Sequence, residues 1–505
     1  MTTAAHEQWR PTLLLTRSFI ADYVRNPVNL IMLVLVPLVF VLVAAGSIAD
    51  AMQLLRGRPD MATQTATAGW AAGFLSGLAM YFQIRSARAA DKRLLLAGLP
   101  PARLLAARAS TGLLMAGLVS AVALLALAAR TGIEHPTRTI IGTLMFALIY
   151  LAIGALVAVA VANPVNGAVV ILLIWLLDVF VGPAGSGGDY VFTRWFPTHF
   201  VTMWMAGTPS HHAGRLGDLG IALVWVVGSL TVAGAVVATG SRTARRRQRS
   251  AGQFPTALRF GLVDLRRNAV LLVLLVIVPA AFVLLSRATT PGRPIVVAVK
   301  ENGVTSRQPF WFPDVHAGVM APIGIGALAA LVGMFVVVDA AAGDNRLRQA
   351  GYRTGVMVSA RLGVVAIAAI AITLATMVVA ATVFSAKQWV GYVAANLLVA
   401  ATYALIGVVI GPLLGKVGGV FVAFLIPFLD LGIIQSPMLR PTPQEWARFL
   451  PGYGVTKVLF DTGLTAHFDE TGPLLMGFAW LVGLLILAGL ILGGGHFVRV
   501  RNKVG

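Results

Sequence analysis

The chain has no cysteine and few charged residues. The absence of cysteine from its 505 residues excludes a disulfide scaffold and a thiolate metal site. Charged residues make up 11% of the sequence, against roughly 25% in an ordinary soluble domain. Hydrophobic residues make up 58%, and the mean hydropathy is +0.85. A soluble fold would lack polar surface, so this composition indicates an integral membrane protein.

Acidic residues are scarce relative to basic ones. There are 39 Lys and Arg against 19 Asp and Glu, which gives a formal net charge of +20. Segments 85–108 and 242–267 and the C-terminal tail hold clusters of basic residues, whereas segment 440–470 is mixed in charge. The positive-inside rule then predicts that both termini are cytoplasmic and that 440–470 is outside. The charge is explained by topology and by attraction to membrane lipids, and no nucleic-acid partner is expected.

Long uncharged windows predict the membrane spans, because charge is costly at the bilayer centre. In the first half they are 26–49, 61–84, 109–129, 139–177 and 219–241, and the fourth is long enough for two helices. In the second half they are 268–286, 315–338, 362–386, 388–415, 417–439 and 471–498. The windows predict an all-α membrane protein with twelve transmembrane helices.

The two halves of the chain match in sequence. At an offset of 242 the matching residues are Arg17, Asp22, Arg25, Asn26 and Pro37 with Arg259, Asp264, Arg267, Asn268 and Pro279. At an offset of 253, polar and glycine matches run from Asp91 to Arg108 and from Asp344 to Arg361, and Tyr150 matches Tyr403. This order predicts two parallel six-helix repeats, at 1–240 and 254–505, joined by a basic cytoplasmic linker at 241–253.

The segments before the first and seventh predicted spans mix apolar residues with charge. Segments 13–24 and 254–265 are predicted to form interfacial lead-in helices in the headgroup region. An ordinary cytoplasmic approach to the membrane is the alternative.

The loops after spans 2 and 8 repeat an ordered pattern. The residues concerned are Asp91, Arg93, Gly98 and Pro100 in the first loop and Asp344, Arg346 and Gly351 in the second. A short, charged amphipathic helix ended by glycine suits docking into a cleft of a cytoplasmic partner. The alternative is that these positive loops serve topology alone, which requires charge but not this repeated order.

Two outside segments and two carboxylates are candidates for an outer gate or pathway. The residues are Asp178, Pro197 and His199 in the first half and Asp430, Pro451 and Tyr453 in the second. The aromatic-rich segments around the prolines predict re-entrant or interfacial helices, or else a plain aromatic belt. For Asp178 and Asp430, proton coupling competes with interfacial exposure or helix pairing.

Residues for catalysis or for metal binding are not evident. Segment 411–417 is one residue short of a phosphate loop and lacks its Ser or Thr, and the pair His211 and His212 has no companion ligands. We therefore expect no enzyme activity, no metal and no cofactor bound by this chain.

Several of these features together resemble ABC-2-type ABC exporter permeases. They are the lead-in segment 13–24, the six-span unit, the Asp91–Pro101 loop and the outer segments beginning at Phe196 and Leu450. The similarity is to the fused, duplicated permeases of bacterial antibiotic exporters, of the tetronasin type. The second half departs from the pattern, because Arg353 stands where Pro100 is in the first, so its docking site need not be equivalent.

The resemblance implies a function in ATP-driven export. Two copies of a separate cytosolic ATPase subunit, which bind ATP and Mg, would push on loops 87–103 and 340–356. The cargo would be hydrophobic or amphiphilic compounds, such as antibiotics, other drugs or lipids, exported across a bacterial plasma membrane. The uncharged character of the spans suits such cargo.

Two other function classes remain open. A proton-coupled secondary transporter of the 6+6 kind, acting in drug efflux, would also place basic loops after spans 2 and 8. Its usual Gly-x-x-x-Asp-Arg-x-Gly-Arg-Arg signature is missing, and it leaves the lead-in segments unexplained. A membrane enzyme would need a cluster of Asp, Glu or His residues facing the membrane, which the sequence does not supply.

Overall fold

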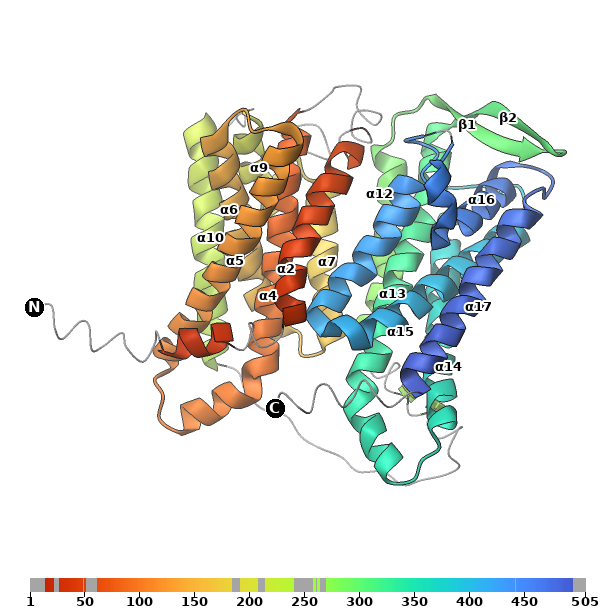
Figure 1. Cartoon of the computed structure of the whole chain (residues 1–505). Helices are drawn as coiled ribbons and strands as arrows, with labels where there is room; N and C mark the ends of the chain where they lie inside the picture. Colours follow the sequence, from red (N-terminus) through yellow and green to blue (C-terminus); the bar gives the residue numbers. More distant parts are fainter. Residues whose placement is uncertain are drawn as a thin grey trace, which may run out of the picture. The chain divides into compact units, whose positions relative to one another are not determined.

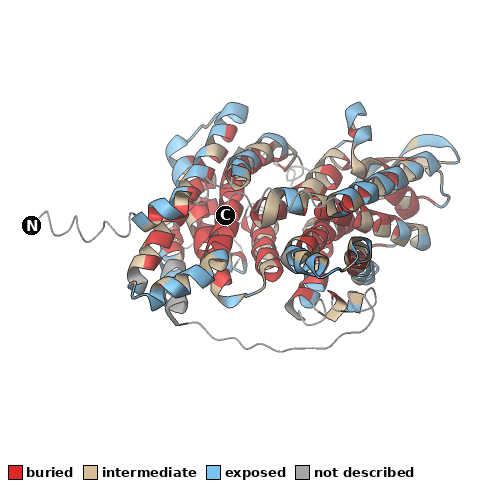
Figure 2. Ribbon diagram, turned by 60° about the horizontal axis from the view of Figure 1, so that its bottom comes forward, coloured by how far each residue is buried: buried red, intermediate tan, exposed pale blue. Residues whose placement is uncertain are grey.

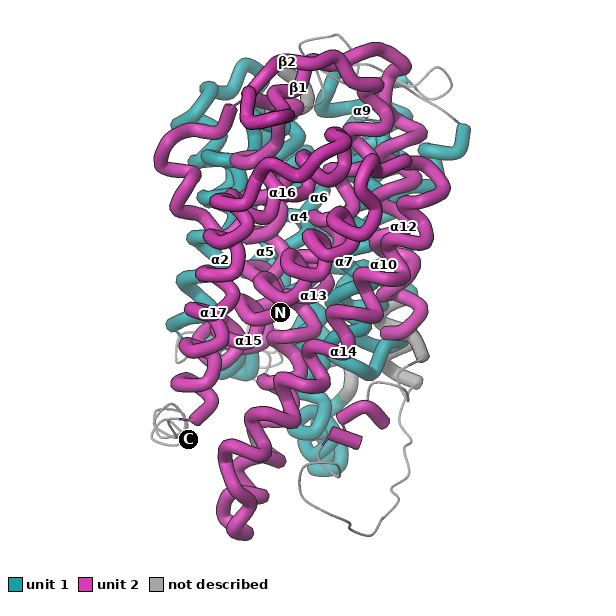
Figure 3. The backbone as a smooth tube through the Cα atoms, turned by 90° about the vertical axis from the view of Figure 1, so that its right-hand side faces the viewer, with its two compact units in different colours: residues 1–245 teal, residues 246–505 magenta. Residues whose placement is uncertain are grey.

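A computed structural model describes residues 14–21, 27–48, 50, 61–183, 191–207, 214–239, 258–259, 261–263, 269–440 and 442–493. The chain divides into two compact units, Met1–Arg245 and Arg246–Gly505 (Figure 3). Their boundary falls within the segment predicted as a linker. That segment, 241–253, lies outside the described residues, as do His211, His212 and the basic tail.

The regular elements described in the first unit are all helices. Its elements are α2 (Pro27–Val39), η1 (Phe40–Ala44), α4 (Met61–Leu96), α5 (Pro101–Thr131), α6 (Pro136–Ala160), α7 (Pro164–Val181), η2 (Thr193–Trp195), α9 (His199–Ala206) and α10 (Gly214–Thr239) (Figure 1). Residues 14–21, in the predicted lead-in segment, are helical as well.

The second unit adds a β-hairpin to its helices. Its elements are α12 (Ala269–Thr289), β1 (Pro294–Glu301), β2 (Val304–Trp311), α13 (Phe312–Gln349), α14 (Thr354–Ala380), α15 (Trp389–Pro427), η3 (Phe428–Ile434), η4 (Glu445–Phe449), α16 (Pro451–Leu464) and α17 (Thr471–Gly493). The antiparallel strands pair from Pro294 opposite Trp311 to Glu301 opposite Val304.

The chain is a multi-pass helical membrane protein. Within the described ranges, nine helices are long and apolar enough to cross a membrane. The expectation of twelve spans is therefore met only in part. One of the nine, Trp389–Ile434, has 46 residues, and Gly415 interrupts it with a φ of 68°. A backbone break at this point divides the helix where the sequence separated two spans.

The hairpin is the departure from the expected all-α fold. Asn302 and Gly303 have φ angles of 54° and 77°, the conformation required at both central residues of a type I′ turn. An Asn-Gly pair between segments of β-branched and apolar residues is the sequence signal for such a hairpin. Charge-free windows alone do not detect it.

Glycines allow the central helices to pack closely in each unit. A Cβ placed on Gly154 of α6 would overlap the carbonyl oxygen of Gly77 on α4. In the second unit a Cβ on Gly407 of α15 would overlap the carbonyl oxygen of Ala330 on α13. Small residues at a crossing bring helix backbones together, which is how helices associate in membranes. The buried residues lie toward the inside of each unit (Figure 2).

Candidate coupling hairpins and outer carboxylate sites

The predicted docking loop of the first unit is a tight turn between two long helices. Helix α4 continues through Asp91 and Arg93 to Leu96, so the expected separate short helix is instead the last turns of α4. The N–H of Leu99 donates to the carbonyl of Leu94 at 3.0 Å, and Gly98 has a φ of 90°. This hydrogen bond and the left-handed glycine form a Schellman-type end. Pro100 then precedes α5.

The second unit closes its loop by the same geometry. The N–H of Tyr352 donates to the carbonyl of Leu347 at 2.9 Å, and Gly351 has a φ of 82°. Arg353 stands before α14 in an extended conformation, in the place that Pro100 takes before α5. The two turns therefore have one shape although only the first contains proline. We call the segments 91–108 and 344–361 the coupling hairpins.

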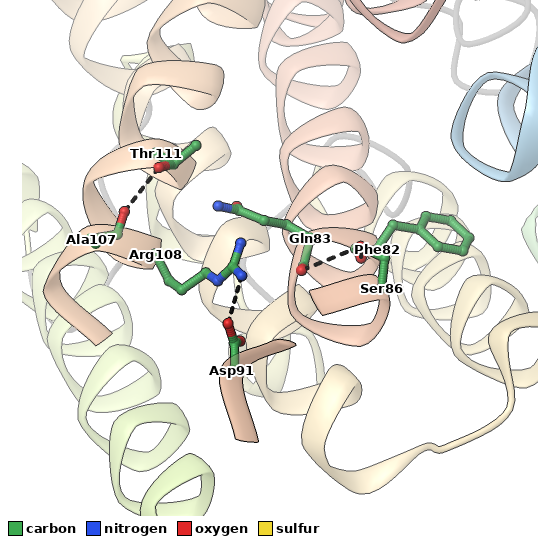
Figure 4. A network of polar contacts seen from close by, with 7 residues as sticks. All are labelled: Phe82, Gln83, Ser86, Asp91, Ala107, Arg108 and Thr111. Atoms are coloured by element: carbon green, nitrogen blue, oxygen red, sulfur yellow. Dashed lines mark hydrogen bonds and ion pairs between the residues drawn. The ribbon is translucent and has the colours of Figure 1, made fainter. Parts of the chain in front are cut away.

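An ion pair braces each coupling hairpin. Arg108 on α5 donates to Asp91 on α4 at 2.7 Å (Figure 4). Arg361 on α14 contacts Asp344 on α13 at 2.8 Å. In both cases the partners are 17 residues apart and largely shielded from solvent. The aspartates predicted to dock a partner thus hold the hairpin itself together.

Other charged residues of the hairpins are exposed. Arg93 and Arg346 are exposed. Leu95, Leu96 and Leu347 are also exposed, at 40%, 79% and 38%. Cationic and apolar side chains therefore share the surface of each tip, which is suited to contact with another protein.

In the first unit the lead-in helix packs on the coupling hairpin. Phe19 forms an apolar cluster with Leu104 and Ala107. The guanidinium of Arg108 lies 3.6 Å from the centre of the Phe19 ring, in cation–π geometry. The matching position in the second half is Gly261, which has no ring and so cannot make this contact with arginine.

Asp178 is buried at the other end of the first unit. Its carboxylate accepts hydrogen bonds from the Tyr150 hydroxyl at 2.7 Å and from the Thr198 hydroxyl at 2.5 Å. Thr198 is the residue that precedes α9, which begins at His199. The carboxylate on α7 therefore links the tyrosine of α6 to the start of α9.

Asp430 has the corresponding contacts in the second unit. It accepts from the Tyr403 hydroxyl at 2.7 Å and from the backbone N–H of Gly452 at 2.8 Å. Gly452 lies in the first turn of α16, where backbone N–H groups are otherwise unpaired. Of the alternatives for these carboxylates, interfacial exposure does not hold, because Asp178 and Asp430 are each only 4% exposed.

The other outer residues surround the two short helices. Pro197 precedes α9, and the ring of His199 is buried with its centre 4.8 Å from that of Phe200. Pro451 is the first residue of α16, where a missing N–H costs nothing. Tyr453 is half-buried and lines a pocket described below. The short helices α9 and α16 lie at the positions where re-entrant or interfacial helices were predicted.

Tyr150 and Tyr403 are the functional candidates that sequence reasoning left unassigned. Both were matched between the halves, but nothing in the sequence pairs them with carboxylates 28 and 27 residues away. Over the described ranges, no group of three His, Cys, Asp or Glu side chains is placed to hold a metal ion. Comparison with known protein families and with curated proteins finds no match.

Proposed function

We propose that this chain is the permease subunit of an ATP-driven exporter of hydrophobic or amphiphilic compounds. Its two units are the two halves of the pathway, and two copies of a cytosolic ATPase subunit drive it. The observation that carries the proposal is the pair of coupling hairpins, each with a Schellman-type turn, an Asp–Arg brace and an exposed arginine.

The brace gives each hairpin the stiffness that force transmission requires. A push on an unbraced loop would bend the loop, whereas a push on a hairpin whose helices are joined by an ion pair moves both helices. In the first unit, Phe19 extends this link to the lead-in helix. Topology alone needs positive charge but explains neither the brace nor the repeated turn.

The decisive experiment measures ATP hydrolysis by the chain reconstituted with an ATPase encoded beside it, in the presence of hydrophobic compounds. Arg93→Glu and Arg346→Glu are expected to abolish stimulated hydrolysis and transport while leaving membrane insertion intact. Lys387→Glu is the matched control, because Lys387 is an exposed cation at the other end of its unit. Normal coupling in both hairpin variants would overturn the docking assignment.

The second candidate is a proton-coupled transporter, and the observation favouring it is the burial of Asp178 and Asp430. Under that function transport would collapse with the proton gradient, and Asp178→Asn with Asp430→Asn would abolish it while ATP depletion would not. The contacts of both carboxylates with a tyrosine and a helix start favour a structural role instead.

A further inference from the structure

Next to the β-hairpin, the second unit contains a small pocket with several charged side chains. It lies between β1, α16 and the residue that precedes α17. Its charged lining residues are Lys300, Arg440, Lys457, Asp461 and Glu470. The volume is about 30 Å³, enough for a small polar group, whereas pockets for drug-sized ligands are roughly 300–1,000 Å³. Only the head of a larger ligand would fit.

Asp461 is not available to the cations of this pocket. Its Oδ1 accepts from the Thr465 hydroxyl at 2.7 Å. Its Oδ2 accepts from the backbone N–H groups of Asp469 and Glu470, at 2.7 and 3.2 Å. The carboxylate thus shapes the approach to α17, and both of its oxygen atoms are occupied by these donors.

Glu470 is the second carboxylate of the lining, and the charges of two lysines act on it. Partial burial raises the pKa of Glu470 above its ordinary value, and the nearby charges of Lys457 and Lys300 act in the opposite direction. The amine of Lys300 also donates to the carbonyl of Asp469 at 3.2 Å. Arg440 is exposed and has no ion pair within the described ranges. Three cations and two carboxylates therefore line the pocket, which leaves a formal excess of one positive charge in the lining.

Two buried polar groups in the wall also lack partners. The Thr456 hydroxyl and the Gln435 Oε1 atom have no hydrogen-bond partner in the part of the chain that the structure describes. Both residues line the pocket. Buried polar atoms are normally paired, so these two can receive a ligand or water that carries hydroxyl groups.

Helix α17 begins directly beside the pocket. Thr471 follows Glu470 and starts a 23-residue apolar helix with only a few buried side chains. The exposed apolar residues of this helix include Leu475, Phe478, Val482, Leu485, Ile486 and Leu490. In a transmembrane helix such a face lies against lipid acyl chains. The pocket and the start of this largely exposed apolar helix are thus adjacent along the chain.

From this adjacency, the cations of the lining and the two unpaired polar atoms, we propose that the pocket holds the phosphate of an anionic phospholipid whose acyl chains lie along α17. Lys300, Arg440 and Lys457 neutralise the phosphate, and the glycerol hydroxyls of a phosphatidylglycerol headgroup supply donors for Gln435. The pocket is too small for a whole cargo molecule, which favours a lipid head over a bound substrate. The site does not depend on ATPase coupling.

The test uses the purified full chain in detergent, titrated with dioctanoyl phosphatidylglycerol and followed by native mass spectrometry. Lys457→Gln is expected to weaken binding about fivefold, the equivalent of one cation near a lipid headgroup. Glu470→Gln is expected to tighten binding, because it removes the competing carboxylate, and a gain cannot arise from misfolding. Lys387→Gln, at an exposed lysine outside the pocket, should leave binding unchanged.

Three probes distinguish the ligand classes. Dioctanoylglycerol, which lacks phosphate, and dioctanoyl phosphatidylcholine, which has no net charge, should bind more weakly than phosphatidylglycerol. If laurate binds as tightly as dioctanoyl phosphatidylglycerol, the pocket is assigned to a carboxylate cargo. If inorganic phosphate binds as tightly as this lipid, acyl chains along α17 contribute nothing to binding. Either result, or equal affinity in all variants, would overturn the proposal. ATPase stimulation in the same preparations tests the exporter function separately.

Discussion

Tyr403 donates a 2.7 Å hydrogen bond to Asp430, and Tyr150 donates one of the same length to Asp178. Each carboxylate also accepts from a residue at the start of the short helix that follows, α16 or α9. Each unit thus uses one buried carboxylate to join a long helix to a short outer helix. In the exporter that we propose, α9 and α16 lie at the outer end of their units, and these contacts would fix the shape of the exit.

Replacing either tyrosine with phenylalanine should destabilise its unit. Tyr150→Phe and Tyr403→Phe remove a donor from a buried carboxylate, which typically costs about 1–3 kcal/mol. Thermal unfolding in detergent measures the loss. Tyr453→Phe is the control, because no hydrogen bond of the Tyr453 hydroxyl is found among the described residues. Equal stability of all three variants would show that the hydroxyls contribute nothing.

Breaking the brace of the second coupling hairpin should loosen it. Asp344→Asn leaves the Arg361 guanidinium largely shielded and without its counter-charge, at a cost of roughly 1–3 kcal/mol for a partly buried pair. The double variant Asp344→Arg with Arg361→Asp should recover part of this loss. Hydrogen exchange over 340–361 and stimulated ATP hydrolysis are the measurements. The absence of any recovery in the swapped pair would argue against the brace.

Replacing a glycine at a close helix crossing should lower stability, whereas replacing a glycine with no nearby atoms should not. Gly154→Ala and Gly407→Ala place a Cβ against a backbone carbonyl, which forces the helices apart and costs roughly 1–3 kcal/mol. Gly117→Ala and Gly489→Ala meet no atom within 4 Å. These two should be neutral or gain up to about 1 kcal/mol from helix propensity. Unfolding curves of the four variants measure these differences in stability, and equal stability of all four would contradict the prediction.

The turn of the β-hairpin should tolerate no branched side chain. Gly303→Val forces a β-branched residue to a φ of 77°, so the ladder of β1 and β2 should open. Hydrogen exchange should rise over 294–311 while the helices keep their protection. Because Lys300 lies on β1, binding of dioctanoyl phosphatidylglycerol should weaken as well. Retained exchange protection in the hairpin would contradict this prediction.

The ends of the coupling hairpins were predictable in position. Gly98 and Gly351 follow charged helical segments, and glycine is the residue that takes the left-handed conformation at a helix end. The sequence also matched Asp91 with Asp344 and Arg108 with Arg361. Matching residues between the halves does not show which residues touch. The two ion pairs are seen only in the structure, where α4 packs against α5 and α13 packs against α14.

The β-hairpin shows where charge-based segmentation fails. Uncharged windows locate apolar helices, because a charge in the bilayer is costly, but they do not register a short polar element between two spans. The Asn302-Gly303 pair carries the signal for this hairpin, which is a matter of turn conformation and not of charge. The interruption of α15 at Gly415, by contrast, falls at the last residue of the predicted window 388–415.

The sequence by itself determined the membrane class, the approximate spans and the positions of the turns, since these follow from local hydropathy, charge and backbone preference. The burial of Asp178 and Asp430 against tyrosines, the Asp–Arg braces and the cationic pocket beside α17 were decided by tertiary structure. Each of them joins residues from different helices or strands, and no local preference specifies which side chains a packed helix will meet.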